Sequence, residues 1–296
     1  MVNSNAIGRI FESSDRKVLI IFYVLVVVWM FSIFARNIRE TPENYSFSLL
    51  YSAIPLIWGI VGFLNTPRWG GFKSAVGRSI LFLSLGLFSW GVGNLIFAYY
   101  NLVLHVAVPY PSLADAFFVL IYPFSAIGIS YLFRTTGATF LLRKMSGKLI
   151  ILSLPIVLGV ASYYLLFVIA RGGIIAYEGD LLKLVLDVLF PVGSAVVAML
   201  AALVYGLSVK SLGGLFRLPI ILILIGFLIN YLADFSFSYT TTTETYFVGM
   251  WIDIFYPTAF LFISLGLSLM DPRSTSRRST VNIETSQGNN TNIHSK

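Results

Sequence analysis

The chain alternates long apolar stretches with short polar segments. Windows with little or no charge cover residues 18–35, 46–64, 79–100, 114–133, 149–170, 218–239 and 249–270, and an eighth window, 181–209, carries Lys183 and Asp187 near its start. A helix that crosses the hydrocarbon core of a bilayer needs roughly 20 apolar residues. The pattern therefore predicts an all-α integral membrane protein with eight transmembrane helices.

Turn and charge signals separate these windows and define the ends of the membrane domain. Residues 65–71 and 171–173 are rich in Gly, Pro and Arg, which favours connections between helices. Residues 1–17 have mixed charge and no small-x-small cleavage site follows the first window, so we interpret that window as an uncleaved helix. We expect a tail over 1–17, a transmembrane domain over 18–270 and a disordered tail over 271–296, which is polar and has no apolar face.

Composition agrees with a membrane protein and restricts its chemistry. The chain is 57% hydrophobic and 11% charged, whereas soluble domains carry about 25% charged residues. It has no cysteine and two histidines, His105 and His294, which excludes thiol chemistry and makes histidine-rich metal sites hard to assemble. We therefore expect no cofactor, no metal and no enzymatic activity. The remaining enzyme alternative is an aspartyl-type intramembrane hydrolase, which requires Asp187 and Asp253 to meet.

Basic residues predict the orientation. With the N-terminus inside, sixteen Lys and Arg residues fall in inner segments and three, Arg36, Arg39 and Arg171, fall in outer loops. This distribution predicts a multi-pass protein of the cell membrane with both termini in the cytoplasm. The net charge of +7 is then explained by contact with the lipid bilayer, so we expect no nucleic-acid partner.

An internal repeat is visible in the prolines. Pro55, Pro123, Pro191 and Pro257 stand in the even-numbered windows at separations of 68, 68 and 66 residues, and an aromatic residue precedes the last three. A related spacing of four occurs twice, as Gly86, Trp90 and Asn94 and as Gly226, Asn230 and Asp234. We interpret the chain as four helical-hairpin repeats of about 68 residues. Hairpins repeat in one orientation, unlike the inverted repeats of many transporters.

Polar residues at membrane depth are the candidate site. The predicted topology places them in the outer half of the bilayer, where they suggest an acidic cavity for a cation, a proton relay or a small polar ligand. The candidates are Asp187, Asp234, Asp253, Asn94, Asn230, Asp115, Tyr122, Tyr256 and Lys183.

Structural roles compete with this interpretation for three of the four acids. Asp115 completes a capping box with Ser112, Asp187 can pair with Lys183 on one helix face, and Asp253 suits a helix N-terminus. Asp234 has no such explanation. Asn44-Tyr45-Ser46 is a glycosylation sequon, and the sequence leaves its use open.

Three segments resemble parts of a known module. Pro111-Ser112-Leu113-Ala114-Asp115, followed by Tyr122-Pro123, is similar to a pattern of a multi-pass membrane sensor module found at the N-terminus of some bacterial and archaeal diguanylate cyclases and histidine kinases. Asp187-x-x-Phe190-Pro191 and Asp253-x-x-Tyr256-Pro257 resemble its second element, although Ser194 stands where that pattern often has another Asp. The resemblance implies a sensor or receptor-like function. We expect a stand-alone module without a cyclase or kinase domain, which signals through a cytoplasmic or membrane partner. The alternative is a small ion- or proton-coupled transporter.

Overall fold

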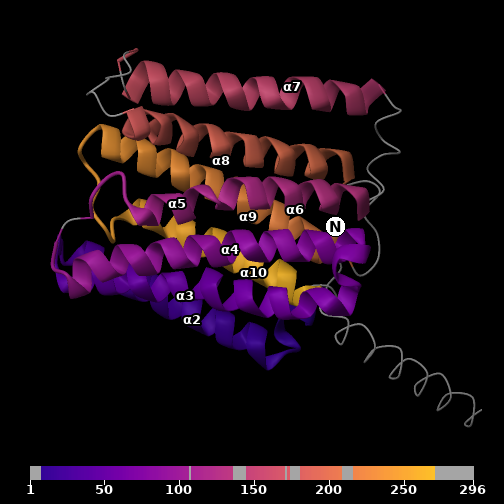
Figure 1. The fold of residues 1–296 in the computed structure, drawn as a ribbon, viewed down its shortest axis with the longest axis horizontal. Coiled ribbons are helices and arrows are strands. Elements are labelled where there is room, and N and C mark those ends of the chain that lie inside the picture. Colours follow the sequence, from indigo (N-terminus) through magenta and orange to yellow (C-terminus); the bar gives the residue numbers. More distant parts are fainter. Residues whose placement is uncertain are drawn as a thin grey trace, which may run out of the picture.

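Helices make up every regular element that the structure, a computed structural model, describes over residues 8–106, 108–135, 145–170, 172–173, 181–208 and 216–270. The all-α prediction is thus confirmed. The long helices run side by side, with α2 at one edge and α7 at the other (Figure 1). Their bounds are α2 Ser14–Ala35, α3 Pro42–Asn65, α4 Ala75–Ala98, α5 Leu113–Val119, α6 Ile121–Thr135, α7 Met145–Ser162, α8 Leu181–Ser208, α9 Arg217–Thr242 and α10 Phe255–Leu269.

Seven helical segments in the described part of the chain are long and apolar enough to cross a membrane, so this is a multi-pass membrane protein. They correspond to seven of the eight predicted windows, with α5 and α6 together forming one segment, Leu113–Thr135. The other predicted window, 149–170, is helical as α7 and a following π-helical segment, Tyr163–Ala170, and its apolar helix is the shorter stretch Ile156–Ile169.

Local sequence signals fix several helix starts. Pro42 occupies the first turn of α3, and the Thr41 and Asn44 side chains form a capping box there. The Ser74 hydroxyl caps α4 by accepting the Gly77 N–H at 2.8 Å. These caps extend α3 and α4 about one turn beyond the predicted windows.

The four repeated prolines are not equivalent in the structure. Pro55 and Pro191 lie inside α3 and α8. Pro123 follows a break at Leu120, where α5 ends and α6 begins, and Pro257 stands in the first turn of α10. A proline has no N–H to donate, so a break or a helix start just before it is the expected accommodation. All four lie within candidate spans, but two stand inside one continuous helix and two stand close to a helix start.

A closed ring of helices forms the core. In this ring each helix packs against the next in the order α3, α4, α6, α8, α9 and α10, and α10 packs against α3 to close it. Outside the ring, α2 lies on α3 and α10, and α7 lies on α8. The interior of the ring is where polar side chains can be screened from lipid.

Two hairpins of the ring, α4–α6 and α9–α10, approach through glycines placed alike. A Cβ on Gly226 of α9 would lie 3.0 Å from the Ala259 carbonyl oxygen, and one on Gly266 of α10 would lie 2.7 Å from that of Pro219. In α4–α6, a Cβ on Gly86 would lie 3.1 Å from the Ser125 hydroxyl, and one on Gly128 would lie 2.7 Å from Leu83. Small residues at these positions let the backbones approach closely, as is common in membrane helix pairs.

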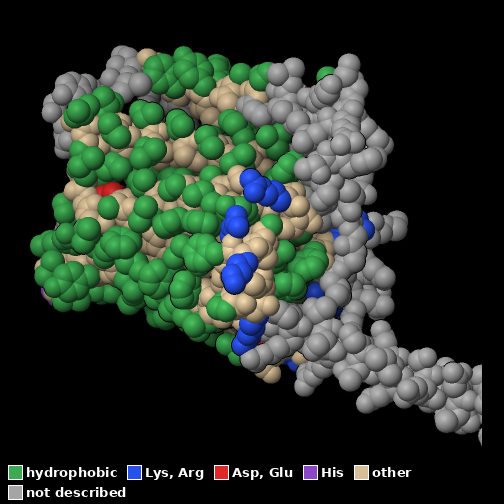
Figure 2. All heavy atoms as spheres, turned by 45° about the vertical axis from the view of Figure 1, so that its right-hand side comes forward, with side chains coloured by type: hydrophobic (Ala, Val, Ile, Leu, Met, Phe, Trp, Pro, Cys, Tyr) green, Lys and Arg blue, Asp and Glu red, His purple; other side chains and the backbone are tan. Residues whose placement is uncertain are grey.

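One end of the bundle carries the basic side chains. Figure 2 shows Lys and Arg gathered in a band toward the end that holds the N-terminus, beside a largely hydrophobic surface. At this end Trp69 donates from Nε1 to the Met270 carbonyl and packs against Phe216, with ring centroids 5.3 Å apart. The Ser268 hydroxyl also donates to Asp15 at 2.9 Å. These contacts place the starts of α2, α4 and α9 and the end of α10 together. Residues 271–296, predicted to be a disordered tail, lie outside the described part of the chain.

Candidate functional site

Asp234 of α9 is the centre of a polar cluster inside the ring, toward the end opposite the basic band. Tyr256 of α10 donates from its hydroxyl to Oδ1 at 3.0 Å. Tyr122 of α6 donates to Oδ2 at 3.3 Å, and the Asn230 amide donates to the same oxygen at 3.0 Å. Three helices therefore meet at one carboxylate. Of the predicted site residues, these four are brought together.

The repeated Tyr-Pro dipeptides explain how two tyrosines reach the same acid. Each proline starts or restarts a helix, so Tyr122 and Tyr256 both stand in the first turns of their helices at one end of the ring. Asn230 is one helical turn before Asp234, which puts their side chains on one face of α9. The hydrogen-bonding geometry thus follows from local rules acting on three separate segments.

Aromatic packing fixes the tyrosines from the other side. Trp90 of α4 lies with its ring centroid 5.5 Å from that of Tyr256, 4.3 Å from that of Phe260 and 5.6 Å from that of Tyr51. A Cβ on Gly193 of α8 would lie 2.7 Å from the Tyr122 ring, so only glycine leaves room for that ring. Tight aromatic contacts of this kind hold the two hydroxyls in position.

Two buried polar atoms near Asp234 have unused bonding capacity. The Asn230 side chain is 5% exposed and its Oδ1 has no hydrogen-bond partner. The Ser194 hydroxyl of α8 is 2% exposed and lies beside the Asp234 carboxylate, with which it forms no hydrogen bond of ordinary geometry. Buried polar groups are normally satisfied, so such atoms mark a place where another group can bind. In the sequence, Ser194 is only a departure from the pattern of the sensor module, and no local signal indicates that it lies beside Asp234.

Asp253 belongs to a different arrangement. It is 2% exposed and accepts the Gly249 N–H at 2.7 Å and the Tyr246 hydroxyl at 3.2 Å, both from the loop that precedes α10. The loop contacts satisfy Asp253 as a structural residue at a helix start.

Of the remaining candidates, Asp115 and Asn94 have local roles, and the other two, Lys183 and Asp187, lie on α8. Asp115 accepts the N–H and hydroxyl of Ser112 at 2.6 and 2.9 Å, so the predicted capping box is confirmed. Asn94 of α4 is buried and donates to the Ser48 carbonyl at 3.4 Å. Lys183 lies partly buried on α8, and the side chain of Asp187 lies outside the described residues. The predicted Asp187–Lys183 pair and the Asp187–Asp253 alternative therefore stay predictions.

The sequon residue Asn44 has a structural environment. It is 0% exposed, and its Nδ2 donates to the Ile38 carbonyl at 2.9 Å and to the Val248 carbonyl at 2.6 Å. A glycan attaches at that nitrogen, so the folded protein has no free N–H there to modify. Asn44 instead joins the α2–α3 connection to the loop before α10.

No protein-family model, curated protein or solved structure matches this chain. No group of three or more His, Cys, Asp or Glu side chains that could hold a metal ion occurs within the described ranges. In that part of the chain the Asp234 carboxylate is bonded to neutral donors and to no cationic side chain.

The chemistry of the Asp234 cluster suits a positive charge. A carboxylate held in a low-dielectric interior is costly unless a cation or a proton compensates it. Neutral donors stabilise the charge partly, and the unused oxygens of Asn230 and Ser194 are acceptors that a cation can also use. The Asp234 residue is itself only partly buried. The cluster thus has the composition of a small cation site.

Proposed function

We propose that the chain is a multi-pass membrane sensor module whose ligand is a small cation, the proton being the smallest, bound at Asp234. The observation that supports this most is a carboxylate that joins α6, α9 and α10 through Tyr122 and Tyr256 without a cationic partner among the described residues. Binding a positive charge there would act on three helices at once.

The response follows from hydrogen-bond chemistry. An ionised carboxylate only accepts hydrogen bonds, whereas a protonated or cation-bound one has fewer free lone pairs for its donors. Neutralising Asp234 would weaken its bonds from Tyr122 and Tyr256 and so relax the junction of the three helices. Because packed helices rearrange between discrete arrangements, this local change can reach their opposite ends. A signalling partner would bind at that basic end.

A transporter carries the ion across the membrane, whereas a sensor only binds it. The same-orientation hairpins and the resemblance to a sensor module favour the sensor, and the matched glycine packing of α4–α6 and α9–α10 supports the repeat. Proteoliposomes that contain the full chain should show no cation or proton flux above that of empty liposomes. Flux that Asp234→Asn abolishes would establish the transporter instead.

A conformational readout tests the sensor directly. Hydrogen–deuterium exchange of the full chain should change on acidification or on sodium addition in the first turns of α6 and α10 and around Asp234. Asp234→Asn should remove this change. Glu244→Gln, which removes an exposed carboxylate from the loop after α9, should keep it. A response that is identical in wild type and Asp234→Asn would refute the proposal.

We also propose eight spans with both termini in the cytoplasm. The sixteen-to-three distribution of Lys and Arg and the basic band at the N-terminal end support it. Reporter fusions at Lys148 and Thr242 should give cytoplasmic and external signals respectively. A fusion at Gly173 should be external if α7 crosses, and a cytoplasmic signal there would leave seven spans.

A further inference from the structure

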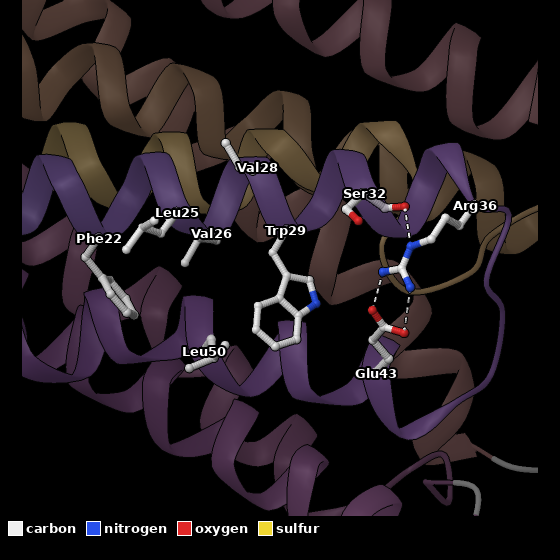
Figure 3. Close-up of a pocket in the computed structure, with 9 residues that line it drawn as sticks. All are labelled: Phe22, Leu25, Val26, Val28, Trp29, Ser32, Arg36, Glu43 and Leu50. Atoms are coloured by element: carbon white, nitrogen blue, oxygen red, sulfur yellow. Dashed lines mark hydrogen bonds and ion pairs between the residues drawn. The ribbon is translucent and has the colours of Figure 1, made fainter.

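A groove lies between α2 and α3 on the outside of the ring, away from the Asp234 cluster. It is an open groove with a volume of about 570 Å³. Its walls are apolar, with Phe22, Val26 and Trp29 from α2 facing Leu50 of α3, while Arg36 and Glu43 close one end (Figure 3). The groove is therefore amphipathic along its length.

The polar end carries one charge of each sign. The Arg36 guanidinium is paired with Glu43 and donates from Nε to the Ser32 carbonyl at 3.1 Å. The two side chains remain 48% and 35% exposed, so the guanidinium keeps N–H donors and the carboxylate keeps lone pairs on the open side. A group that fits this end must itself present an anion beside a cation.

The length of the groove matches one leaflet. Phe22 and Ser32 are ten residues apart on α2, which is roughly 15 Å along the helix axis. The hydrocarbon core of a bilayer is about 30 Å thick, so the apolar part covers about half of it. Trp29 lies toward the polar end, where tryptophan favours the membrane interface.

We propose that this groove binds one zwitterionic glycerophospholipid. An acyl chain lies along Phe22, Val26 and Leu50, the head-group phosphate accepts from Arg36, and the head-group ammonium contacts Glu43. An anionic lipid fits less well, because the Arg36–Glu43 pair is neutral as a whole and an anionic head group adds a negative charge beside Glu43 without a cation of its own. This inference does not depend on the proposed sensing site.

Native mass spectrometry of the delipidated full chain tests it. The protein is offered an equimolar mixture of phosphatidylethanolamine and phosphatidylglycerol in detergent. We expect a dominant adduct with one phosphatidylethanolamine. Arg36→Gln should weaken it about tenfold, as for loss of a charge-assisted contact to phosphate. Arg39→Gln is the matched control, because Arg39 lies in the same connection, over the Phe247 ring, and does not line the groove.

A second pair of variants tests the apolar part. Leu50→Trp fills the groove and should reduce the adduct, whereas Ile21→Trp on an exposed position of α2 outside the groove should not. Adducts that are unchanged in both Arg36→Gln and Leu50→Trp would show only annular lipid. That result, or preferential binding of phosphatidylglycerol, would overturn the proposal.

Discussion

Replacing Asn44 by Ala should destabilise the protein strongly, because this one side chain joins the α2–α3 connection to the loop before α10. Its amide donates to the carbonyls of Ile38 and Val248, and its Oδ1 accepts the N–H and hydroxyl of Thr41 at 3.1 and 2.8 Å. The bond to Val248 bridges 204 residues of sequence. The substitution would leave the two carbonyl groups and the N–H and hydroxyl of Thr41 without the hydrogen bonds that Asn44 now makes.

The expected magnitude follows from those contacts. A typical intramolecular hydrogen bond contributes about 0.5–1.5 kcal/mol net, and a buried group left without its partner costs about 1–3 kcal/mol. Since water can reach some of the freed groups and the contributions are not additive, we expect a loss of about 2–4 kcal/mol for Asn44→Ala. That is a large fraction of the stability of an ordinary domain.

The assay combines unfolding with mass measurement. Thermal or denaturant unfolding of the detergent-solubilised chain should show the loss for Asn44→Ala. Ser46→Ala is the matched control, since it also destroys the sequon but removes only a hydroxyl that donates to the Pro42 carbonyl within α3. The intact mass from a glycosylating host should show no glycan on the wild type. A glycan on Asn44, or equal stability of the two variants, would refute the reasoning.

Two further predictions concern helix packing and the tyrosines. Gly266→Ala should lower the stability of the protein by about 1–3 kcal/mol, because the added Cβ overpacks α10 against α9. Gly159→Ala should be tolerated, because its Cβ would lie 3.6 Å from Met199. The unfolding midpoints of the two variants, measured against wild type, test this. Tyr256→Phe should cost about 1.5–3 kcal/mol by removing a hydrogen bond to a carboxylate, while Tyr163→Phe, at a 59% exposed position, should have little effect in the same assay.

The sequence predicts the helices well because their signal is local. Hydropathy over a span, proline position and capping residues such as Thr41 and Ser74 are all read from neighbouring residues. The membrane character and most helix ends follow from them. The ring order does not, because nothing local specifies that α6 packs against α8 or that α10 closes on α3.

The sequence predicts which residues are candidates for the site, but it does not predict which of them lie together. Repeated Tyr-Pro dipeptides and the Asn230–Asp234 spacing pointed to the residues that meet. Asp115 and Asp253 do not join the hydrogen bonds around Asp234, since each is bonded at its own helix start. The place of Ser194 beside Asp234 depends on how α8 packs against α9, and that is a tertiary property.

Infrared difference spectroscopy of Asp234 tests the central claim most directly. Spectra of the full chain are recorded on acidification and on sodium addition, for wild type, Asp234→Asn and Glu244→Gln. The account predicts that at least one of these ions changes a carboxyl band together with tyrosine bands in wild type and Glu244→Gln, and that Asp234→Asn lacks both changes. Spectra of Asp234→Asn that match those of wild type would contradict it.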